Sequence, residues 1–351
     1  MKDLTEFQCP SCGGKMEFDA ATQKLKCPYC DTILSIDQYN ALHPQEQPQT
    51  VQNEWSKEEL GNLVVYTCKS CGGEIMTDAT TGATTCPFCS SPVVMNATFS
   101  GSLRPDYVIP FKKSKQEAKQ SYFKHLEGKS FLPSVFKDEN HIDEIKGVYV
   151  PFWVYDLTVE GDMEYDGTIV RTWSDSEYDY TETNHFDVVR TGDVDYEKIP
   201  CKASSHMDTA LMESIEPYDF KDAESFKKAF LAGYYANRYD ISQEKGQELI
   251  QERIQNSTRD VFRESLSQYA ATTPMRENIS IKRVRPYYVL YPVWLLNTTW
   301  NDEHYQFAMN GQTGKFVGNL PADNAAFFSY VVKTAIPCAI VIFIIMLVFF
   351  S

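Results

Sequence analysis

Eight cysteines near the start of the chain repeat one metal-binding pattern, C-x2-C-x14-C-x2-C. The first copy consists of Cys9, Cys12, Cys27 and Cys30, and the second of Cys68, Cys71, Cys86 and Cys89. Two residues between paired cysteines allow both sulfurs to reach one ion, and the longer spacing suits a small β-hairpin that returns the second pair. Each copy therefore predicts a zinc ribbon.

Four thiolates complete the tetrahedral coordination of zinc and leave no position for a substrate, so we expect two structural Zn²⁺ ions and no catalytic metal. A glycine pair follows Cys12 and Cys71, and glycine allows positive φ in the tight turn of each knuckle. A redox dithiol needs one exposed CxxC and gains nothing from a second pair at fixed distance. A disulfide framework belongs to exported proteins, and no signal peptide precedes this one.

The other end of the chain is strongly apolar. Residues 330–350 carry a single charge, that of Lys333. As a helix they would cover roughly 30 Å, the thickness of the hydrocarbon core of a bilayer. We therefore expect a transmembrane helix at 330–350, with the protein tail-anchored in the cell membrane by a single pass and the bulk of the chain in the cytoplasm.

Between these ends the sequence predicts an α+β domain with antiparallel strands and a helical section. Strand-like apolar runs occupy 108–111, 147–155, 163–173, 178–194, 279–300 and 304–317, and helical spacing covers 221–269. Ser114 and Glu117 form a capping box that opens a helix ending near Leu126. The predicted organisation is zinc ribbon 1 at 1–36, a linker rich in Gln and Pro at 37–60, zinc ribbon 2 at 61–95, the acidic α+β domain at 100–325 and the transmembrane helix at 330–350.

Two segments of the central domain share a Pro-x-Trp sequence at the start of a strand, which places Trp153 and Trp294 at equivalent positions. Paired half-sheets would explain the repeat. Large aromatic side chains favour packing in the core over an exposed binding platform.

Residues 156–197 hold 13 acidic residues against Arg171 and Arg190. Glu160, Asp162, Glu164 and Asp166 alternate, so a strand places them on one face. This face is either solvated or a docking surface for a basic partner, and pairing with Lys282, Arg283 and Arg285 would neutralise part of it.

Charge disfavours nucleic acid as a partner. Residues 1–35 hold four lysines and five acids, and residues 61–93 hold one lysine and two acids. Phosphate binding depends on clustered Lys and Arg.

Motifs disfavour an enzyme, and the sequence identifies no small-molecule substrate. The segment from Asn310 to Lys315 superficially suggests a phosphate loop, but its glycines are too close and Phe316 follows the lysine, which indicates a hairpin turn. No lipase, zincin or dinucleotide-binding motif occurs, and no ATPase motif either.

Several of these segments resemble a family of bacterial membrane-anchored proteins with TFIIB-type double zinc ribbons, often labelled helicase-related. The similar segments are CPSCGG, CKSCGG, Val108–Phe111, Gly147–Trp153 and Asn310–Lys315. The resemblance implies a component of a membrane-associated protein assembly connected with envelope stress. We therefore expect a tail-anchored adaptor or scaffold for other proteins. The alternative hypothesis is a membrane-tethered nucleic-acid-binding or transcription-related factor, and an enzyme of another kind comes third.

Overall fold

A computed structural model describes residues 7–42, 55, 63–78, 85–96, 103–129, 131–142 and 144–350, with the backbone alone at 140–141, 325–326 and 341–350. The predicted linker at 37–60 lies outside the described residues except for Trp55 and the end of helix α1 (Ile36–Leu42).

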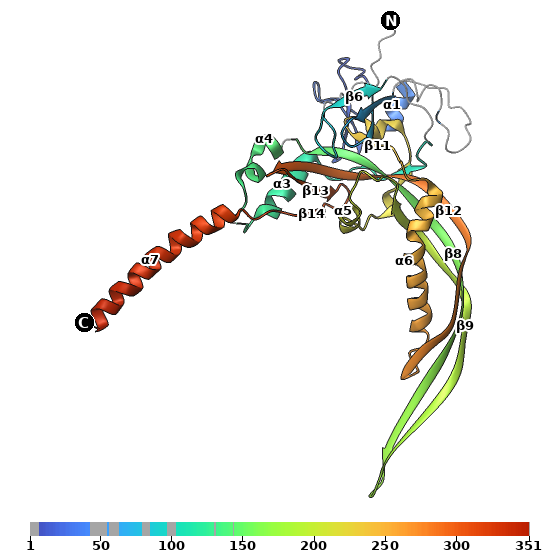
Figure 1. The fold of residues 1–351 in the computed structure, drawn as a ribbon. Coiled ribbons are helices and arrows are strands. Elements are labelled where there is room, and N and C mark those ends of the chain that lie inside the picture. The colour runs from blue at the N-terminus through green and yellow to red at the C-terminus, as the bar shows by residue number, and fades with distance from the viewer. Residues whose placement is uncertain are drawn as a thin grey trace.

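Three very long antiparallel strands dominate the molecule and curve together over most of its length (Figure 1). They are β8 (Lys146–Ser174), β9 (Asp179–Lys202) and β12 (Ala271–Trp300), with β8 in the middle. The sequence predicts separate strands at 147–155 and 163–173, whereas β8 runs through both. Gly161 lies between the two predicted strands, and the chain does not turn there. Its missing side chain leaves space for the ring of Phe262 against the strand.

The long strands belong to an 11-stranded sheet whose main order is β10-β7-β12-β8-β11-β5-β4-β6. The short strands are β10 (Glu224–Ser225), β7 (Tyr107–Val108), β11 (Tyr235–Asn237), β5 (Glu74–Asp78), β4 (Leu63–Cys68) and β6 (Val93–Asn96). Strands β13 (Glu303–Asn310) and β14 (Phe316–Gly318) extend it beside β12. A separate three-stranded sheet near the N-terminus contains β1 (Glu17–Asp19), β2 (Lys24–Lys26) and β3 (Ile33–Leu34).

Helices cover this sheet, and the chain is α+β as predicted. The capping box at Ser114 is confirmed and begins α3 (Lys115–Leu126). The longest covering helix, α6 (Gln243–Glu264), packs along the three long strands (Figure 1). The shorter helices are η1 (Ser134–Lys137), α4 (Glu139–Ile142), α5 (Thr209–Ser214), η2 (Phe220–Asp222) and η3 (Lys228–Leu231).

The helical section predicted at 221–269 is only partly correct. Its first half contains η2, η3 and the short strands β10 and β11, and the chain turns at Gly233 with φ +84°. Phe226 and Phe230 are nevertheless buried. The two rings are spaced as on a helical face, but they are buried by a compact loop. Periodicity therefore predicts a helix where the chain forms a loop.

The two equivalent tryptophans lie in the core, as expected. Trp153 and Trp294 are 2 % and 5 % exposed, and their indole N–H groups donate to the carbonyls of Ile241 and Lys113. Each buried ring thus has its polar atom satisfied. The segments that contain them pair directly as neighbouring antiparallel strands, with Val150 opposite Tyr291.

The four alternating acids share one face of β8, as the parity predicts, because Met163 and Tyr165 between them are buried. Cations of β12 pair with this face. Lys282 lies 2.9 Å from Glu160 and 3.0 Å from Asp193 of β9. Arg276 lies 2.6 Å from Glu164 and 3.3 Å from Asp162. The acidic face is therefore partly neutralised within the chain.

The chain ends in helix α7 (Asn324–Phe350), which projects away from the sheet (Figure 1). Its side chains are described only as far as Ile340, and that part includes Lys333, Thr334 and Pro337. That part ends at Ile340 and is shorter than the roughly 20 apolar residues that a bilayer requires. Within the described residues no helix is long and apolar enough to cross a membrane. The predicted transmembrane helix at 330–350 is therefore wrong, as is the single-pass cell-membrane location.

Candidate metal centres

The structure brings all eight predicted cysteines into two groups of four. Within each group the sulfurs lie within 4.8 Å of one another. The closest pairs measure 3.5 Å for Cys9–Cys30, 3.6 Å for Cys12–Cys27, 3.5 Å for Cys68–Cys89 and 3.7 Å for Cys71–Cys86. Zinc–sulfur bonds of about 2.3 Å in a tetrahedron separate the sulfurs by about 3.8 Å. Both groups are therefore compatible with zinc.

Each group is built from two knuckle turns with the same backbone hydrogen bonds. In the first group Cys9 N–H donates to Gly14 C=O at 2.7 Å, and Gly13 N–H donates to Cys9 C=O at 2.8 Å. The equivalent bonds of the second group measure 2.9 and 2.8 Å. Gly13 and Gly72 have φ of +73° and +76°, as the glycine pairs predict. The turn needs this conformation, which costs other residues about 1–2 kcal/mol.

The second knuckle turn of each group has an equivalent backbone hydrogen bond, but a residue other than glycine adopts the positive φ. Cys27 N–H donates to Thr32 C=O at 2.9 Å, and Cys86 N–H donates to Ser91 C=O at 2.8 Å. Here Asp31 and Ser90 adopt positive φ, at 56° and 58°. The two modules therefore share their backbone geometry at all four turns.

Hydrogen bonding divides the thiols of each group into easily and poorly ionised members. Burial acts to raise the pKa of Cys9, but the backbone N–H groups of Ser11 and Cys12 point at the sulfur and lower that pKa to about 6. Burial likewise opposes ionisation of Cys89, yet the hydroxyl and N–H of Ser91 lower its pKa to about 7.

Other members of each group hold their protons more tightly. The pKa of Cys12 is raised to about 12, because the neighbouring thiols of Cys30 and Cys27 outweigh the favourable N–H of Gly14. Burial raises the pKa of Cys71 to about 11 and raises that of Cys86 as well. Four thiolates cannot coexist without a compensating cation, which a divalent metal supplies on binding.

The second module is part of the main sheet. Its strand β5 pairs with β11, which in turn pairs with β8. The carboxylate of Glu74 lies 2.5 Å from the guanidinium of Arg238 next to this pairing. On the far side, the Asn297 amide donates to Pro87 C=O at 2.5 Å, directly beside Cys86. Strands from distant parts of the sequence therefore fix this group of four cysteines.

The first module keeps its own small sheet and docks through a few contacts. Phe18 N–H donates to Ala232 C=O at 3.1 Å, and the Phe18 ring packs edge-on against Phe230 at 5.2 Å. The Gln23 amide donates to Phe111 C=O at 2.7 Å. These contacts, the ion pair of Lys227 with Asp37 at 2.8 Å and a common hydrophobic cluster connect the module to the body without a shared strand.

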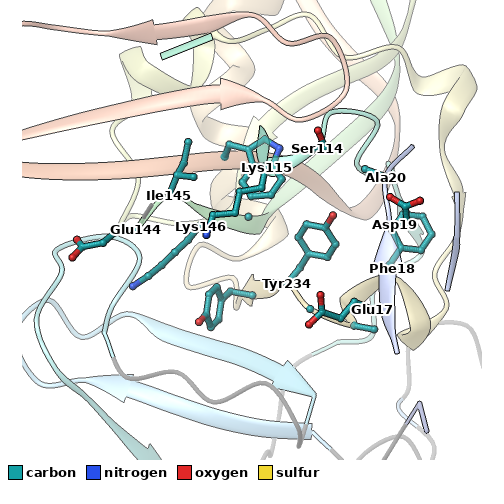
Figure 2. A pocket seen from close by; sticks show the side chains of 15 residues that line it. Glu17, Phe18, Asp19, Ala20, Ser114, Lys115, Glu144, Ile145, Lys146 and Tyr234 are labelled. Atoms are coloured by element: carbon teal, nitrogen blue, oxygen red, sulfur yellow. The ribbon is translucent and has the colours of Figure 1, made fainter. Parts of the chain in front are cut away.

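Two pockets that meet at Glu144 and Lys146 form a cleft, and Figure 2 shows the part of it beside the first module. Its larger part, about 420 Å³, adjoins Glu17–Ala20 of the first module, and its other part, about 390 Å³, adjoins Thr85–Pro87 of the second. Glu144 and Lys146 line both parts. We call this the inter-ribbon cleft.

Aromatic and charged groups face one another at the first end of this cleft. The ring of Tyr234 lies near Glu17 and Asp19 (Figure 2). Burial, together with those two carboxylates, raises the pKa of the Tyr234 hydroxyl. At the other end Lys146 donates to Thr85 C=O at 3.0 Å, and burial lowers the pKa of its ammonium. Sequence patterns gave no signal for this cleft, because its walls come from segments more than 200 positions apart.

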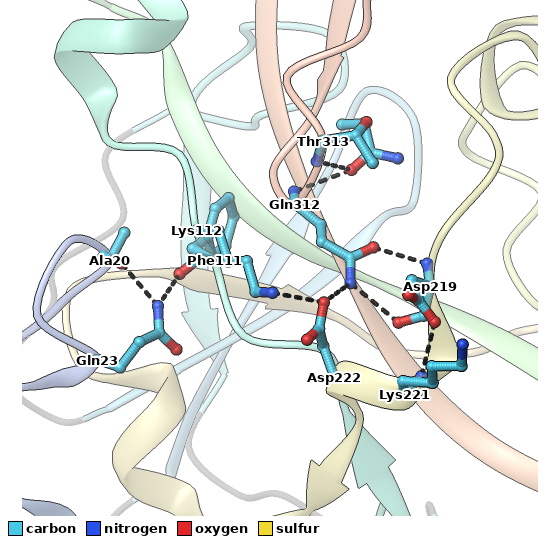
Figure 3. A network of polar contacts seen from close by, with 10 residues as sticks. Ala20, Gln23, Phe111, Lys112, Asp219, Lys221, Asp222, Gln312 and Thr313 are labelled. Carbon is cyan, nitrogen blue, oxygen red and sulfur yellow. Dashed lines mark hydrogen bonds and ion pairs between the residues drawn. The ribbon is translucent and has the colours of Figure 1, made fainter.

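The segment from Asn310 to Lys315 is a hairpin turn between β13 and β14, as predicted. Its buried polar side chains have a structural role that the sequence did not reveal. Gln312 bonds Asp219 through both its amide oxygen and nitrogen, and Lys112 lies 2.6 Å from Asp222 in the same network (Figure 3). This turn therefore ties loop 215–222 to the sheet, and it shows no phosphate cradle.

Comparison with known proteins gives one informative similarity. The chain is 36 % identical over 338 residues to the Bacillus subtilis (strain 168) protein printed as "Uncharacterized protein YdjG", with 93 % of this chain and 94 % of that protein covered. No family model matches the chain. No solved structure matches it either.

Proposed function

This chain and Bacillus subtilis YdjG belong to one family, and we propose that the chain is a scaffold that binds other proteins through two zinc ribbons. The observation that carries the proposal is the convergence of each cysteine set within 4.8 Å. Four protein ligands per ion leave no position for a substrate, so each zinc holds structure rather than performing chemistry.

The inter-ribbon cleft is the proposed docking place. Its walls combine the folded central domain with Glu17–Ala20 and Thr85–Pro87 of the two modules, so its shape persists without a partner, and a preorganised site loses less free energy on binding. An extended peptide segment suits a cleft lined along its length by backbone and side-chain polar groups. The carboxylates of Glu17 and Asp19 beside the ring of Tyr234 suit a lysine or arginine of that segment.

Charge supports a protein partner over nucleic acid. The net charge of the chain is −15, and neither ribbon is basic. Each zinc with four thiolates adds about two further negative charges. Phosphate backbones are repelled by such a surface, whereas basic segments of proteins are attracted.

Affinity capture with the full-length, zinc-loaded protein tests the proposal. We expect specific proteins to be retained, and to be lost when Glu17 and Asp19 are both changed to Arg. Glu252→Arg, on the exposed side of α6, is the matched control and should retain them. Zinc content must stay unchanged in both variants.

Two results would contradict the proposal that the chain is a scaffold. One is retention of the same proteins by the cleft variant and by a chain stripped of zinc. The other is recovery of DNA or RNA in place of protein, with binding that weakens steeply as salt rises, which supports the alternative hypothesis.

A further inference from the structure

The outer edge of β9 is the longest open strand edge of the described chain. β9 has 24 residues and pairs with β8 on one side. On its other side no strand pairs with it among the residues that the structure describes. Open edges present unpaired N–H and C=O groups and readily pair with another chain.

The hydrogen bonds of β8 identify which groups of β9 point outward. Ala270 N–H donates to Thr168 C=O at 2.7 Å, so even-numbered residues of β8 here direct their backbone groups toward β12. Odd-numbered residues such as Gly167 therefore face β9, where Gly167 is opposite Phe186. It follows that Phe186 points inward and that the odd-numbered residues from 181 to 191 point outward.

Side chains confirm this direction and show where the edge is protected. Arg190 donates to Val189 C=O at 3.0 Å, as an outward carbonyl allows. Near the end of the strand Arg253 donates to Pro200 C=O at 2.8 Å, and Pro200 has no N–H to offer. Proline and bound arginine are typical devices that close an edge. The stretch 181–188 carries neither.

We propose that two copies of this chain join edge to edge, β9 against β9, about a two-fold axis that passes through Phe186. In this antiparallel register His185 meets Asp187 of the second copy, and Thr183 meets Val189. All four point outward, so they form the hydrogen-bonded pairs that such a ladder requires once Arg190 releases the Val189 C=O and turns toward Glu182 of the second copy. The result is a continuous six-stranded sheet with both copies of α6 on the same face.

Charge complementarity selects this register. Glu182 stands opposite Arg190 of the second copy, and both side chains lie on the same face. Centring the pairing on Asp187 sets that carboxylate against itself, and centring it on His185 does the same for the imidazole. Among centres from 184 to 188, only Phe186 places both basic residues of the edge, His185 and Arg190, opposite acids.

The residue pairs at the two ends of the paired segment are also compatible with this register. Tyr180 falls opposite Gly192 of the second copy, where a Cβ would meet nothing within 4 Å, so the ring has space to cover the glycine. Aromatic residues paired across from edge glycines stabilise sheets in this way. One step further Asp179 meets Asp193, and this repulsion ends the ladder.

The same charges make the pairing of two copies specific to one register. Residues 156–197 hold 13 acids and two arginines, so a second copy is repelled in registers that set acid against acid. The two-fold register uses Arg190 twice, once in each direction, and thereby turns a repulsive edge into a self-complementary one.

Charge exchange provides the sharpest test. The molar mass of the full-length, zinc-loaded protein in solution should show a dimer. Arg190→Glu and Glu182→Arg should each weaken it about tenfold, because like charges then meet at both symmetric contacts. A mixture of the two single variants should restore dimers, since every contact then pairs Glu with Arg. Ser265→Ala is the control for the contact that Arg190 makes inside its own chain, and it should leave the dimer intact.

A cross-link locates the axis independently. Residues in a non-hydrogen-bonded antiparallel pair have Cα atoms about 4.5 Å apart, within reach of a disulfide. Phe186→Cys should therefore give a linked dimer on mild oxidation, whereas Asn184→Cys, about 13 Å from its own copy, should not. A monomeric wild type, or charge variants that dimerise as well as the wild type with no link at 186, would overturn the proposal.

Discussion

The two cysteine modules share a metal frame but differ in how they join the molecule. Both close the same knuckle turns at Gly13 and Gly72. The first keeps a sheet of its own, whereas β5 of the second is a strand of the main sheet. The geometry of each group of four cysteines is therefore set by the local motif, and its connection to the rest of the molecule is set by the hydrogen bonds around that motif.

The cysteines of the first module are also more exposed than those of the second. Cys12 and Cys30 of the first module are exposed, whereas Cys71 and Cys89 of the second are half-buried. Loss of metal from the first module should disturb one small sheet. Loss from the second should disturb the attachment of β4, β5 and β6 to the body.

The largest expected effect comes from removing one ligand in each module. Cys27→Ser and Cys86→Ser should each reduce the zinc content from two ions to one, because three ligands no longer hold a structural ion. Cys86→Ser should also lower the Tm of the main transition by about 5 °C or more, since β5 is part of the main sheet. Cys27→Ser should leave that transition in place. Equal shifts of Tm in the two variants would contradict the comparison.

Zinc removal by a chelator should separate the two modules in time. The exposed sulfurs of Cys12 and Cys30 are accessible, so the first ion should leave before the second. Acid should act likewise, because protons compete with zinc for thiolates and metal is lost as the pH falls. A colorimetric zinc indicator follows both processes. Release in one phase from the wild type, or loss of the slow phase in Cys27→Ser, would show that exposure does not distinguish the sites.

A smaller effect is expected at the two turn glycines. Gly13→Ala and Gly72→Ala should each cost about 1–2 kcal/mol, because both need positive φ, and zinc affinity should fall by a factor of about five or more. Asparagine tolerates this conformation better, so Gly13→Asn is the matched variant and should lose less. Competition titration with a chelator measures the affinities. If alanine and asparagine were equally tolerated, the turn would not be under this constraint.

The smallest effect concerns the docking of the first module. Gln23→Ala removes bonds to Ala20 C=O and Phe111 C=O and should cost about 1 kcal/mol. Amides of residues 7–34 should then exchange hydrogen faster, with β4 and β5 unchanged. Asn297→Ala should speed hydrogen exchange in β4 and β5 and leave residues 7–34 unchanged, because it releases Pro87 of the second module. Identical exchange profiles would argue against separate docking.

Sequence predicts the metal sites far better than the architecture that holds them. The spacing of the cysteines and the glycine pairs is enough to place all eight sulfurs, because a tetrahedral ion tolerates few arrangements. The capping box at Ser114 is equally local, and the structure confirms it. Each of these signals depends on neighbours within a few residues.

Features that depend on distant pairing are not predicted. Nothing local shows that β5 adds to β11, or that β8 continues without a turn through Gly161. The aromatic spacing around Phe226 and Phe230 indicates a helix, yet tertiary burial selects such residues in a loop as well. The apolar C-terminal segment led to a membrane assignment that the described helix does not support.

The most direct test of the account is the metal content and coordination of the reduced, purified chain. Elemental analysis with X-ray absorption at the zinc edge should give two zinc ions per chain, each with four sulfur neighbours at about 2.3 Å. Less than one zinc per chain, or a shell that contains nitrogen or oxygen in place of sulfur, would contradict two structural sites of four cysteines each.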